Sequence, residues 1–361
     1  MQFGSDNQTG CSTKVLEALV AANAGHTHGY GHDAWTERAV AALREVFETD
    51  LDAYFVSTGT AANCLALASL VQPWQVVLCH AQSHIVADES TAPEFFTGGA
   101  RAQGIGHGEA MLTEQTLRAH LDRAGHEPPH NAQAGAVSIA QATEAGLVYA
   151  PPDIAALADC AHANSLSLHM DGARFSNALV SQGCSPADLT WKAGVDILTL
   201  GASKNGCLAA EAILVFRKDL AASIEHRRKR SGRLLSKGRF FGAQILGWLA
   251  DGHWLDLARH ANRQATGLAK RLAAIPGVSL VWPVQANEVF VVMPCSVSGQ
   301  LHKEGAEFYE WSVDAMPSGR QLQRDEVLVR LVCSFATTNA HVETLVSRTL
   351  QLSAGTDSSA S

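Results

Sequence analysis

The sequence has no run of about 18 uncharged apolar residues, the length that spans a membrane, so we expect no membrane segment. Its eight cysteines are scattered without Cys-x-x-Cys pairs, which excludes zinc-finger geometry and favours a reduced, cytoplasmic protein. The N-terminus lacks the basic and apolar regions of a secretory signal, so we expect no signal peptide. Basic residues number 27 against 35 acidic ones, and this net charge of −8 argues against general nucleic-acid binding.

The length of 361 residues exceeds the roughly 250–300 at which a single core usually splits, so we expect two domains. Strands alternate with helices in the first part, which predicts a mostly parallel, doubly wound sheet. After an apolar helix predicted over 240–257, three strands surround a short helix, which is typical of a small α+β domain. The predicted divisions are an N-terminal arm at 1–12, a large domain at 13–240, a small C-terminal domain at 241–352 and a disordered tail at 353–361.

Two charged residues each follow a short apolar run that reads as a buried strand. Asp171 ends the run that begins at Ser165, and Lys204 comes shortly after the run 196–200. Charged groups at strand ends of an open α/β sheet lie in the crevice where ligands bind. An amine that holds the cofactor and an acid that pairs with its pyridinium nitrogen are what pyridoxal phosphate chemistry requires. The alternative is that both are ordinary loop charges.

The segment 57–63, Ser-Thr-Gly-Thr-Ala-Ala-Asn, stands between a predicted strand and a predicted helix. Gly59 lets the backbone approach an anion, Thr60 offers a hydroxyl, and the helix N-terminus supplies free N–H groups. The Gly-Lys-[Ser/Thr] of a Walker A loop is missing, and no dinucleotide fingerprint is present. The segment therefore predicts a phosphate cradle that is not of the nucleotide-binding kind.

The motifs His-Met-Asp-Gly-Ala-Arg-Phe-Ser-Asn at 169–177 and Lys-Asn-Gly at 204–206 resemble those of the low-specificity L-threonine aldolases. The resemblance covers roughly residues 3–350 and, through Gln-Ala-Thr-Glu at 141–144, is closest to a bacterial branch that accepts a broad range of aldehydes. It implies pyridoxal 5'-phosphate and the aminotransferase-like fold type I. That fold is α/β, with a large, mostly parallel seven-stranded sheet domain and a small α+β C-terminal domain.

The resemblance also assigns roles around the cofactor. His84 matches the side chain that stacks on the pyridine ring, and a neutral imidazole there could also accept a proton. His84 is therefore the first candidate for the catalytic base, directly or through water, with Tyr30 or an ordered water as the alternatives. Asp88 or Glu89 could orient the imidazole, and we favour Glu89. Arg174 matches an arginine beside the cofactor and substrate, although it could instead form a plain salt bridge.

Arg330 stands inside an apolar strand, so it requires an anionic partner. An internal carboxylate would suffice, but the resemblance implies that Arg330, together with Ser5, holds the substrate carboxylate, which arginine binds bidentately. It also implies that Tyr30 reaches the neighbouring subunit's site and that Arg239 contacts the partner's cofactor phosphate, within a homotetramer of dimers.

The remaining charged and histidine-rich segments are interpreted as structural. The loop 25–33 holds three histidines and an aspartate, but His-x-His is a weak metal signal, so we expect no metal. The basic run 227–230 could suggest nucleic acid, but a solvated helix face fits the acidic chain better.

The resemblance predicts cleavage of L-threonine, L-allo-threonine or phenylserine to glycine and an aldehyde. The same scaffold supports β-elimination, racemisation or transamination, because the outcome depends on which bond at Cα is held perpendicular to the ring. A non-catalytic scaffold protein of the same fold is the alternative from another class.

Overall fold

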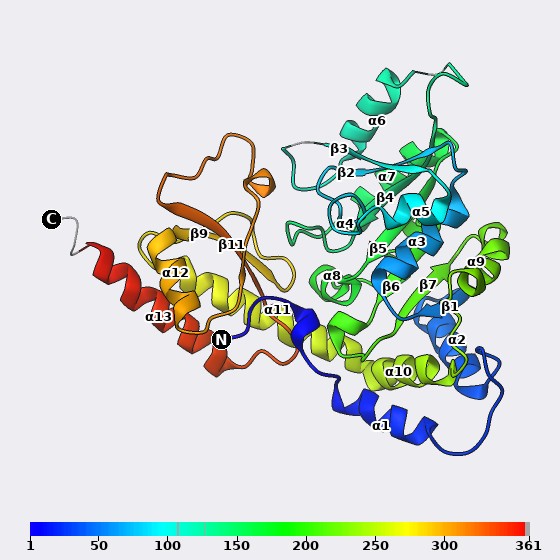
Figure 1. Ribbon diagram of the computed structural model, residues 1–361, viewed down its shortest axis with the longest axis horizontal. Helices are drawn as coiled ribbons and strands as arrows, with labels where there is room; N and C mark the ends of the chain where they lie inside the picture. The colour runs from blue at the N-terminus through cyan, green and yellow to red at the C-terminus, as the bar shows by residue number, and fades with distance from the viewer. Residues whose placement is uncertain (107, 126, 358–361) are drawn as a thin grey trace.

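The computed structural model describes residues 1–106, 108–125 and 127–357. Figure 1 shows a larger lobe built around one sheet and a smaller lobe around a second sheet, with helix α11 (His253–Leu272) running from one to the other. The seven-stranded sheet lies within residues 52–215 and the four-stranded sheet within 279–332. The division that we placed at residue 241 stays a prediction.

The larger sheet has the strand order β1-β7-β6-β5-β4-β2-β3. Only β7 runs antiparallel to its neighbours, which confirms the predicted mostly parallel sheet. Strands β2, β6 and β7 are buried along their whole length, as expected for apolar strands covered on both faces. The strands are β1 (Asp52–Val56), β2 (Val76–His80), β3 (Arg101–Ile105), β4 (Ala134–Ala140), β5 (Ser167–Gly172), β6 (Ile197–Gly201) and β7 (Glu211–Val215).

Helices cover both faces of this sheet. The most enclosed is α3, in which every residue from 61 to 68 is buried, and its many alanines let it lie close against the strands. The helices of this lobe are α1 (Thr13–Ala22), α2 (Ala34–Val46), α3 (Gly59–Leu70), α4 (His84–Ala87), α5 (Ala92–Thr97), α6 (Glu114–Arg123), α7 (Pro151–Ala163), α8 (Phe175–Gln182), α9 (Ile224–Arg230) and α10 (Arg239–Leu249). Short 3-10 turns are η1 (Asp6–Gln8), η2 (Trp191–Ala193), η3 (Ser203–Asn205), η4 (Lys218–Ser223) and η5 (Ala250–Gly252).

The predicted helix over 240–257 is two helices. Helix α10 ends at Leu249 and α11 begins at His253, with Asp251 at φ 53° and Gly252 at φ 70° between them. These left-handed conformations interrupt the helical hydrogen bonds, and Gly252 adopts its own without steric cost. The break lets α10 stay with α1 and α2 while α11 runs on to the smaller lobe (Figure 1).

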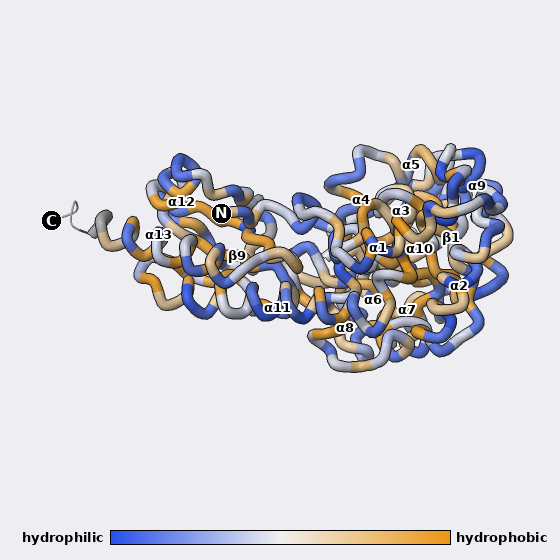
Figure 2. Tube along the Cα trace, turned by 90° about the horizontal axis from the view of Figure 1, so that it is seen from below, coloured by the Kyte–Doolittle hydropathy of each residue, from blue (hydrophilic) through white to orange (hydrophobic). Residues whose placement is uncertain are grey.

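The smaller lobe confirms the predicted α+β arrangement. Its antiparallel sheet has the order β10-β11-β9-β8, and Figure 2 shows apolar residues concentrated inside both lobes. Its elements are β8 (Ser279–Leu280), β9 (Glu288–Pro294), α12 (Cys295–Lys303), β10 (Tyr309–Glu310), η6 (Val313–Ala315), β11 (Glu326–Val332) and α13 (Asn339–Asp357).

The tail that we expected to be disordered from residue 353 is helical as far as Asp357. Its composition is small and polar, but Leu352 still packs against the core of the smaller lobe and Ser353 is buried. These contacts extend α13 beyond the point at which composition alone suggests disorder. Residues 358–361 lie outside the described part of the chain.

The N-terminal arm is held firmly rather than solvated. Phe3 is buried in the core of the smaller lobe, its N–H donates to the Glu307 carbonyl at 2.8 Å, and its carbonyl accepts from the Val332 N–H at 2.8 Å. Asp6, three residues later, is buried between the lobes. The arm therefore adds to the smaller sheet before it reaches the larger lobe. No helix among the described residues is long and apolar enough to cross a membrane.

Candidate active site

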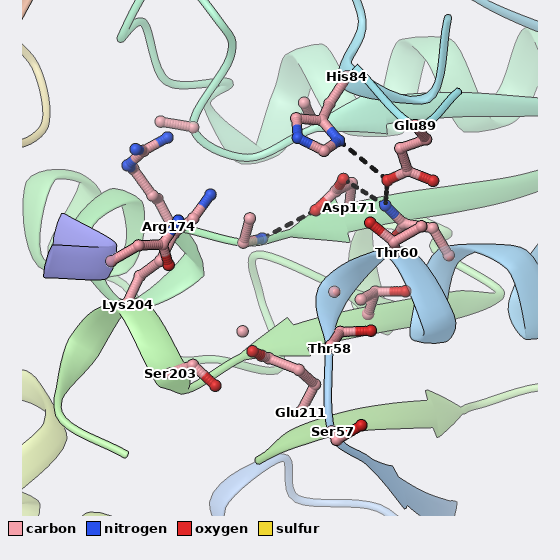
Figure 3. Close-up of a pocket in the computed structure, with 18 of the residues that line it drawn as sticks. Ser57, Thr58, Thr60, His84, Glu89, Asp171, Arg174, Ser203, Lys204 and Glu211 are labelled. Atoms are coloured by element: carbon pink, nitrogen blue, oxygen red, sulfur yellow. Dashed lines mark hydrogen bonds and ion pairs between the residues drawn. The ribbon is translucent and has the colours of Figure 1, made fainter. Parts of the chain in front are cut away.

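A cavity of about 380 Å³ opens where the parallel strands of the larger sheet end and α3 begins. Asp171 lies near the end of β5, and Lys204 lies in η3, just after β6. Both side chains line this cavity, and Figure 3 shows Asp171 reaching it from β5 and Lys204 from the turn after β6. The predicted meeting of the acid and the amine in one crevice is therefore present.

A chain of hydrogen bonds connects Asp171 to His84. Asn63 Nδ2 donates to Asp171 Oδ2 at 2.7 Å and to Glu89 Oε1 at 2.9 Å. The same Glu89 oxygen lies 2.9 Å from His84 Nδ1, so the predicted contact between Glu89 and His84 is confirmed. The second Asp171 oxygen accepts from the Ala173 N–H at 2.9 Å. The network holds the acid and the imidazole in fixed orientations on the same side of the cavity (Figure 3).

The imidazole of His84 is placed for proton chemistry by this contact. The hydrogen bond to Glu89 raises the pKa of His84, although burial works against the increase. The Glu89 side chain is fully buried, and His84 Nδ1 is the ring nitrogen that faces it. The other ring nitrogen, Nε2, is left for the cavity.

The N-terminus of α3 forms the end of the cavity that suits a phosphate. Thr58, Gly59 and Thr60 line it, and the Thr58 hydroxyl caps the helix by accepting from the Ala61 N–H at 3.2 Å. A Cβ added at Gly59 would meet no atom within 4 Å, so it would occupy open cavity next to the free helical N–H groups. Ser203 lines the cavity from the side of Lys204.

These features fit pyridoxal 5'-phosphate. The cavity offers an anion site at a helix N-terminus, an amine for covalent attachment and a carboxylate for the pyridinium nitrogen. The residues that would hold the cofactor are Lys204, Asp171, His84, Gly59 and Thr60, all of which line the cavity as the sequence predicts.

Arg174 also lines the cavity, and it is joined to two buried acids. Its Nε and Nη2 donate to Asp6 at 2.8 and 3.0 Å, and its Nη1 lies 3.4 Å from Glu288 Oε1. Burial raises the pKa of Asp6 and the Arg174 guanidinium lowers it, and the net shift is downward. Arg174 therefore forms the salt bridge that we considered as an alternative, and it also lines the cavity.

Arg330 and Ser5 lie behind Arg174 and do not line the cavity. Arg330 Nη1 is 3.8 Å from the same Glu288 oxygen, and its guanidinium lies 4.0 Å from the centre of the Trp311 ring. Ser5 caps η1 by accepting from the Asn7 N–H at 3.1 Å. Glu288 therefore joins the two arginines, and the internal carboxylate that Arg330 requires is present, although at a loose distance.

Tyr30 and Arg239 lie outside the cavity of their own chain. Tyr30 is 47 % exposed and lies against Lys229, whose Nζ is 4.8 Å from the ring centre. Arg239 donates to the Ala24 and Gly25 carbonyls at 3.4 and 3.2 Å. Within the described ranges, no cluster of His, Cys, Asp or Glu could hold a metal ion.

Sequence reasoning gave no role to several residues of the site. Asn63 belongs to the segment 57–63 and Glu144 to the Gln-Ala-Thr-Glu motif, but the sequence assigns neither residue a function. Glu211 lines the cavity and accepts from the Ala202 N–H at 2.8 Å. Asp6 and Glu288 belong to no recognisable local motif, so the sequence gives no sign of their role.

Comparison with known proteins gives consistent results. The family model for beta-eliminating lyases matches residues 2–296. The low specificity L-threonine aldolase of Pseudomonas sp. (strain NCIMB 10558) is 42% identical over 95% of both chains. That of Pseudomonas aeruginosa is 42% identical over 92% of this chain and 97% of its own. The solved structure of Leishmania major threonine aldolase has a TM-score of 0.89 and 25% identity, and it covers 98% of this chain and 99% of that one.

The structural likeness confirms the predicted fold type I, with its large, mostly parallel sheet and its smaller α+β lobe. The family model covers well over half of the chain, and the relatives match it almost from end to end. On these grounds, the chain belongs to the beta-eliminating lyase family.

Proposed function

We propose that this chain is a carbon–carbon lyase that cleaves L-threonine, L-allo-threonine and related β-hydroxy-α-amino acids such as phenylserine. The products are glycine and an aldehyde, and the cofactor is pyridoxal 5'-phosphate. The observation that carries the proposal is the single cavity shared by Lys204, Asp171 and the N-terminus of α3. The names of the relatives that are 42% identical to the chain support the choice of substrate.

When bound, pyridoxal phosphate supplies an electron sink for the electron pair of a bond that breaks at Cα. Lys204 would attach the cofactor through Nζ, and Asp171 would keep a positive charge on its ring nitrogen. Asn63 and the Ala173 N–H hold the Asp171 carboxylate toward the cavity. Gly59 and Thr60, which line the cavity at the start of α3, would receive the phosphate, and His84, which also lines it, would stack on the ring.

Substrate orientation falls to the arginines. Arg174 faces the cavity and shares the Glu288 carboxylate with Arg330, and Ser5 directly precedes Asp6, which also binds Arg174. We propose that the substrate carboxylate binds there, since guanidinium groups bind carboxylates bidentately. Fixing the carboxylate fixes the torsion about the bond from nitrogen to Cα, and this determines which bond at Cα can break.

The assembly and location that we propose are a cytoplasmic homotetramer made of dimers. Tyr30 lies in the loop before α2 and Arg239 lies at the start of α10, and neither lines the cavity of its own chain. Arg239 would then contact the cofactor phosphate of the partner subunit, and Tyr30 would reach the partner's substrate.

The test is to incubate the purified holoenzyme with each of the four threonine stereoisomers and quantify the products. We expect glycine and acetaldehyde in equal amounts from the L-isomers. Ammonia with a 2-oxo acid would indicate β-elimination, and inversion at Cα would indicate a racemase. A purified protein that binds no pyridoxal phosphate and turns over none of the four would support the non-catalytic scaffold.

A further inference from the structure

Glu144 lines the cavity, and the Gln-Ala-Thr-Glu motif that contains it gives it no function. It follows β4, so it emerges at the same sheet edge as Asp171 and Lys204. Its side chain lines the cavity, and Oε1 accepts the backbone N–H of His84 at 2.8 Å. A glutamine at this position also has a side-chain oxygen that could accept the His84 N–H.

The other acidic groups of the cavity are committed elsewhere. Both oxygens of Asp171 accept hydrogen bonds, one from Asn63 Nδ2 and one from the Ala173 N–H. The Glu89 side chain is fully buried and is occupied by Asn63 and His84. Glu211 accepts from the Ala202 N–H on the floor of the cavity, beside Ser203 (Figure 3). Glu144 is the remaining acidic side chain of the cavity lining.

We propose that Glu144 is the base that removes the proton from the β-hydroxyl group of the substrate. The inference rests on the proposed aldol cleavage. The hydroxyl proton passes to a Glu144 oxygen, the O–H electron pair forms the C=O bond of the aldehyde, and the Cα–Cβ bond breaks. With pyridoxal phosphate bound, the cofactor would take up the electron pair of that bond, and Cα would then gain a proton from solvent to give glycine. Glu144 then releases its proton to solvent.

Electrostatics favour Glu144 over His84 for this step. The titratable groups that interact with Glu144 are His84 from α4, Asp171 from β5, Arg174 from the turn before α8, Cys79 from β2 and Tyr149 from the loop before α7. Burial raises the pKa of Glu144 to about 7, so it is a stronger base than an ordinary carboxylate and still ionises near neutral pH. The hydrogen bond to Glu89 raises the pKa of His84, so at a given pH a smaller fraction of the imidazole is unprotonated and able to accept a proton.

The experiment compares the holoenzymes of wild type, Glu144→Gln and Glu45→Gln. Glu45 is exposed on α2, and its side chain makes no hydrogen bond or ion pair with the described residues, so it is a matched control. Three quantities are measured for each protein. They are the cleavage of L-threonine, the binding of glycine from the change in cofactor absorbance, and the exchange of the glycine α-proton with D2O by NMR. Glycine has no β-hydroxyl, so its binding and exchange do not require this base.

We expect Glu144→Gln to lose about 10²–10⁴-fold in kcat for L-threonine, the typical contribution of a general base. Glycine binding and glycine exchange should stay at wild-type values, as all three quantities should for Glu45→Gln. The wild-type rate should also rise with pH through about 7, where Glu144 ionises, and the variant should lack this rise.

Cleavage at the wild-type rate by Glu144→Gln would overturn the assignment. A parallel loss of cleavage, glycine binding and exchange would also overturn it, because it would show that Glu144 only supports the fold or the cofactor. Failure of the wild-type enzyme to form any aldehyde would instead refute the proposed function itself, whatever the variant does.

Discussion

Replacing Asp6 with Asn tests whether the N-terminal arm stabilises the junction between the lobes. The Asp6 carboxylate is 2% exposed and binds the Arg174 guanidinium with two hydrogen bonds, at 2.8 and 3.0 Å. Breaking a buried ion pair by removing one partner costs about 3–5 kcal/mol. Glu288 remains 3.4 Å from Arg174 and offsets part of the loss, so we expect the lower end, about 3 kcal/mol. For a chain of 361 residues this corresponds to a decrease in Tm of about 4 °C.

The assay is urea denaturation of both holoenzymes at pH 7 and at lower pH. The folded pKa of Asp6 is below its ordinary value of 3.8, so its contribution is present above that value and is lost as the pH falls through the folded pKa. The difference between wild type and Asp6→Asn should therefore be largest at pH 7 and shrink in acid.

The matched control is Asp256→Asn, since Asp256 pairs with Arg259 at 2.7 Å but both side chains are largely exposed. That change should cost at most about 1 kcal/mol. The reasoning about the arm is refuted if Asp6→Asn is no more destabilising than Asp256→Asn, or if its effect is unchanged in acid.

Three further outcomes are expected. Lys204→Ala should abolish the absorbance of covalently held cofactor and the cleavage of L-threonine, and a variant that keeps both would exclude Lys204 as the attachment point. Arg239→Ala should weaken cofactor binding, as measured by equilibrium dialysis. Mixing this variant with Lys204→Ala under subunit exchange should restore part of the activity, because the hybrid dimer has one cavity in which both residues are intact. The absence of such complementation would mean that Arg239 acts within its own chain. Burial raises the pKa of Glu211 to about 7, so the folded state holds more protons than the unfolded state between its ordinary value of 4.5 and about 7, and stability should fall with rising pH over that window. Glu211→Gln should remove this decrease and be more stable than wild type at pH 8 but not at pH 4.5, as measured by denaturation at both pH values.

The parts of the site that follow strands could be predicted from the sequence. Asp171 and Lys204 each come after an apolar run, and the carboxyl ends of parallel strands meet at one edge of a sheet. The phosphate end was equally visible, because Gly59 and Thr60 begin a helix directly after a strand. Local pattern and one general rule of sheet topology are enough for these four residues.

Partnerships between distant side chains could not be predicted in this way. Asn63 and Asp171 are 108 positions apart, and their hydrogen bond depends on how α3 is rotated against the sheet. Asp6 and Arg174 are 168 positions apart and meet only because the arm crosses between the lobes. The break after Leu249 was missed because the apolar pattern continues across it, and only the backbone at Asp251 and Gly252 reveals it.

The way in which the first residues are anchored determines where an affinity tag should be attached. The Met1 carbonyl accepts the Glu307 N–H at 2.8 Å, and the strand pairing through Phe3 follows at once, so an N-terminal fusion would start inside a paired edge. The far end of α13 points away from both sheets (Figure 1). An affinity tag placed after α13 leaves the ion pair between Asp6 and Arg174 intact, whereas removing the first few residues, Asp6 included, breaks it.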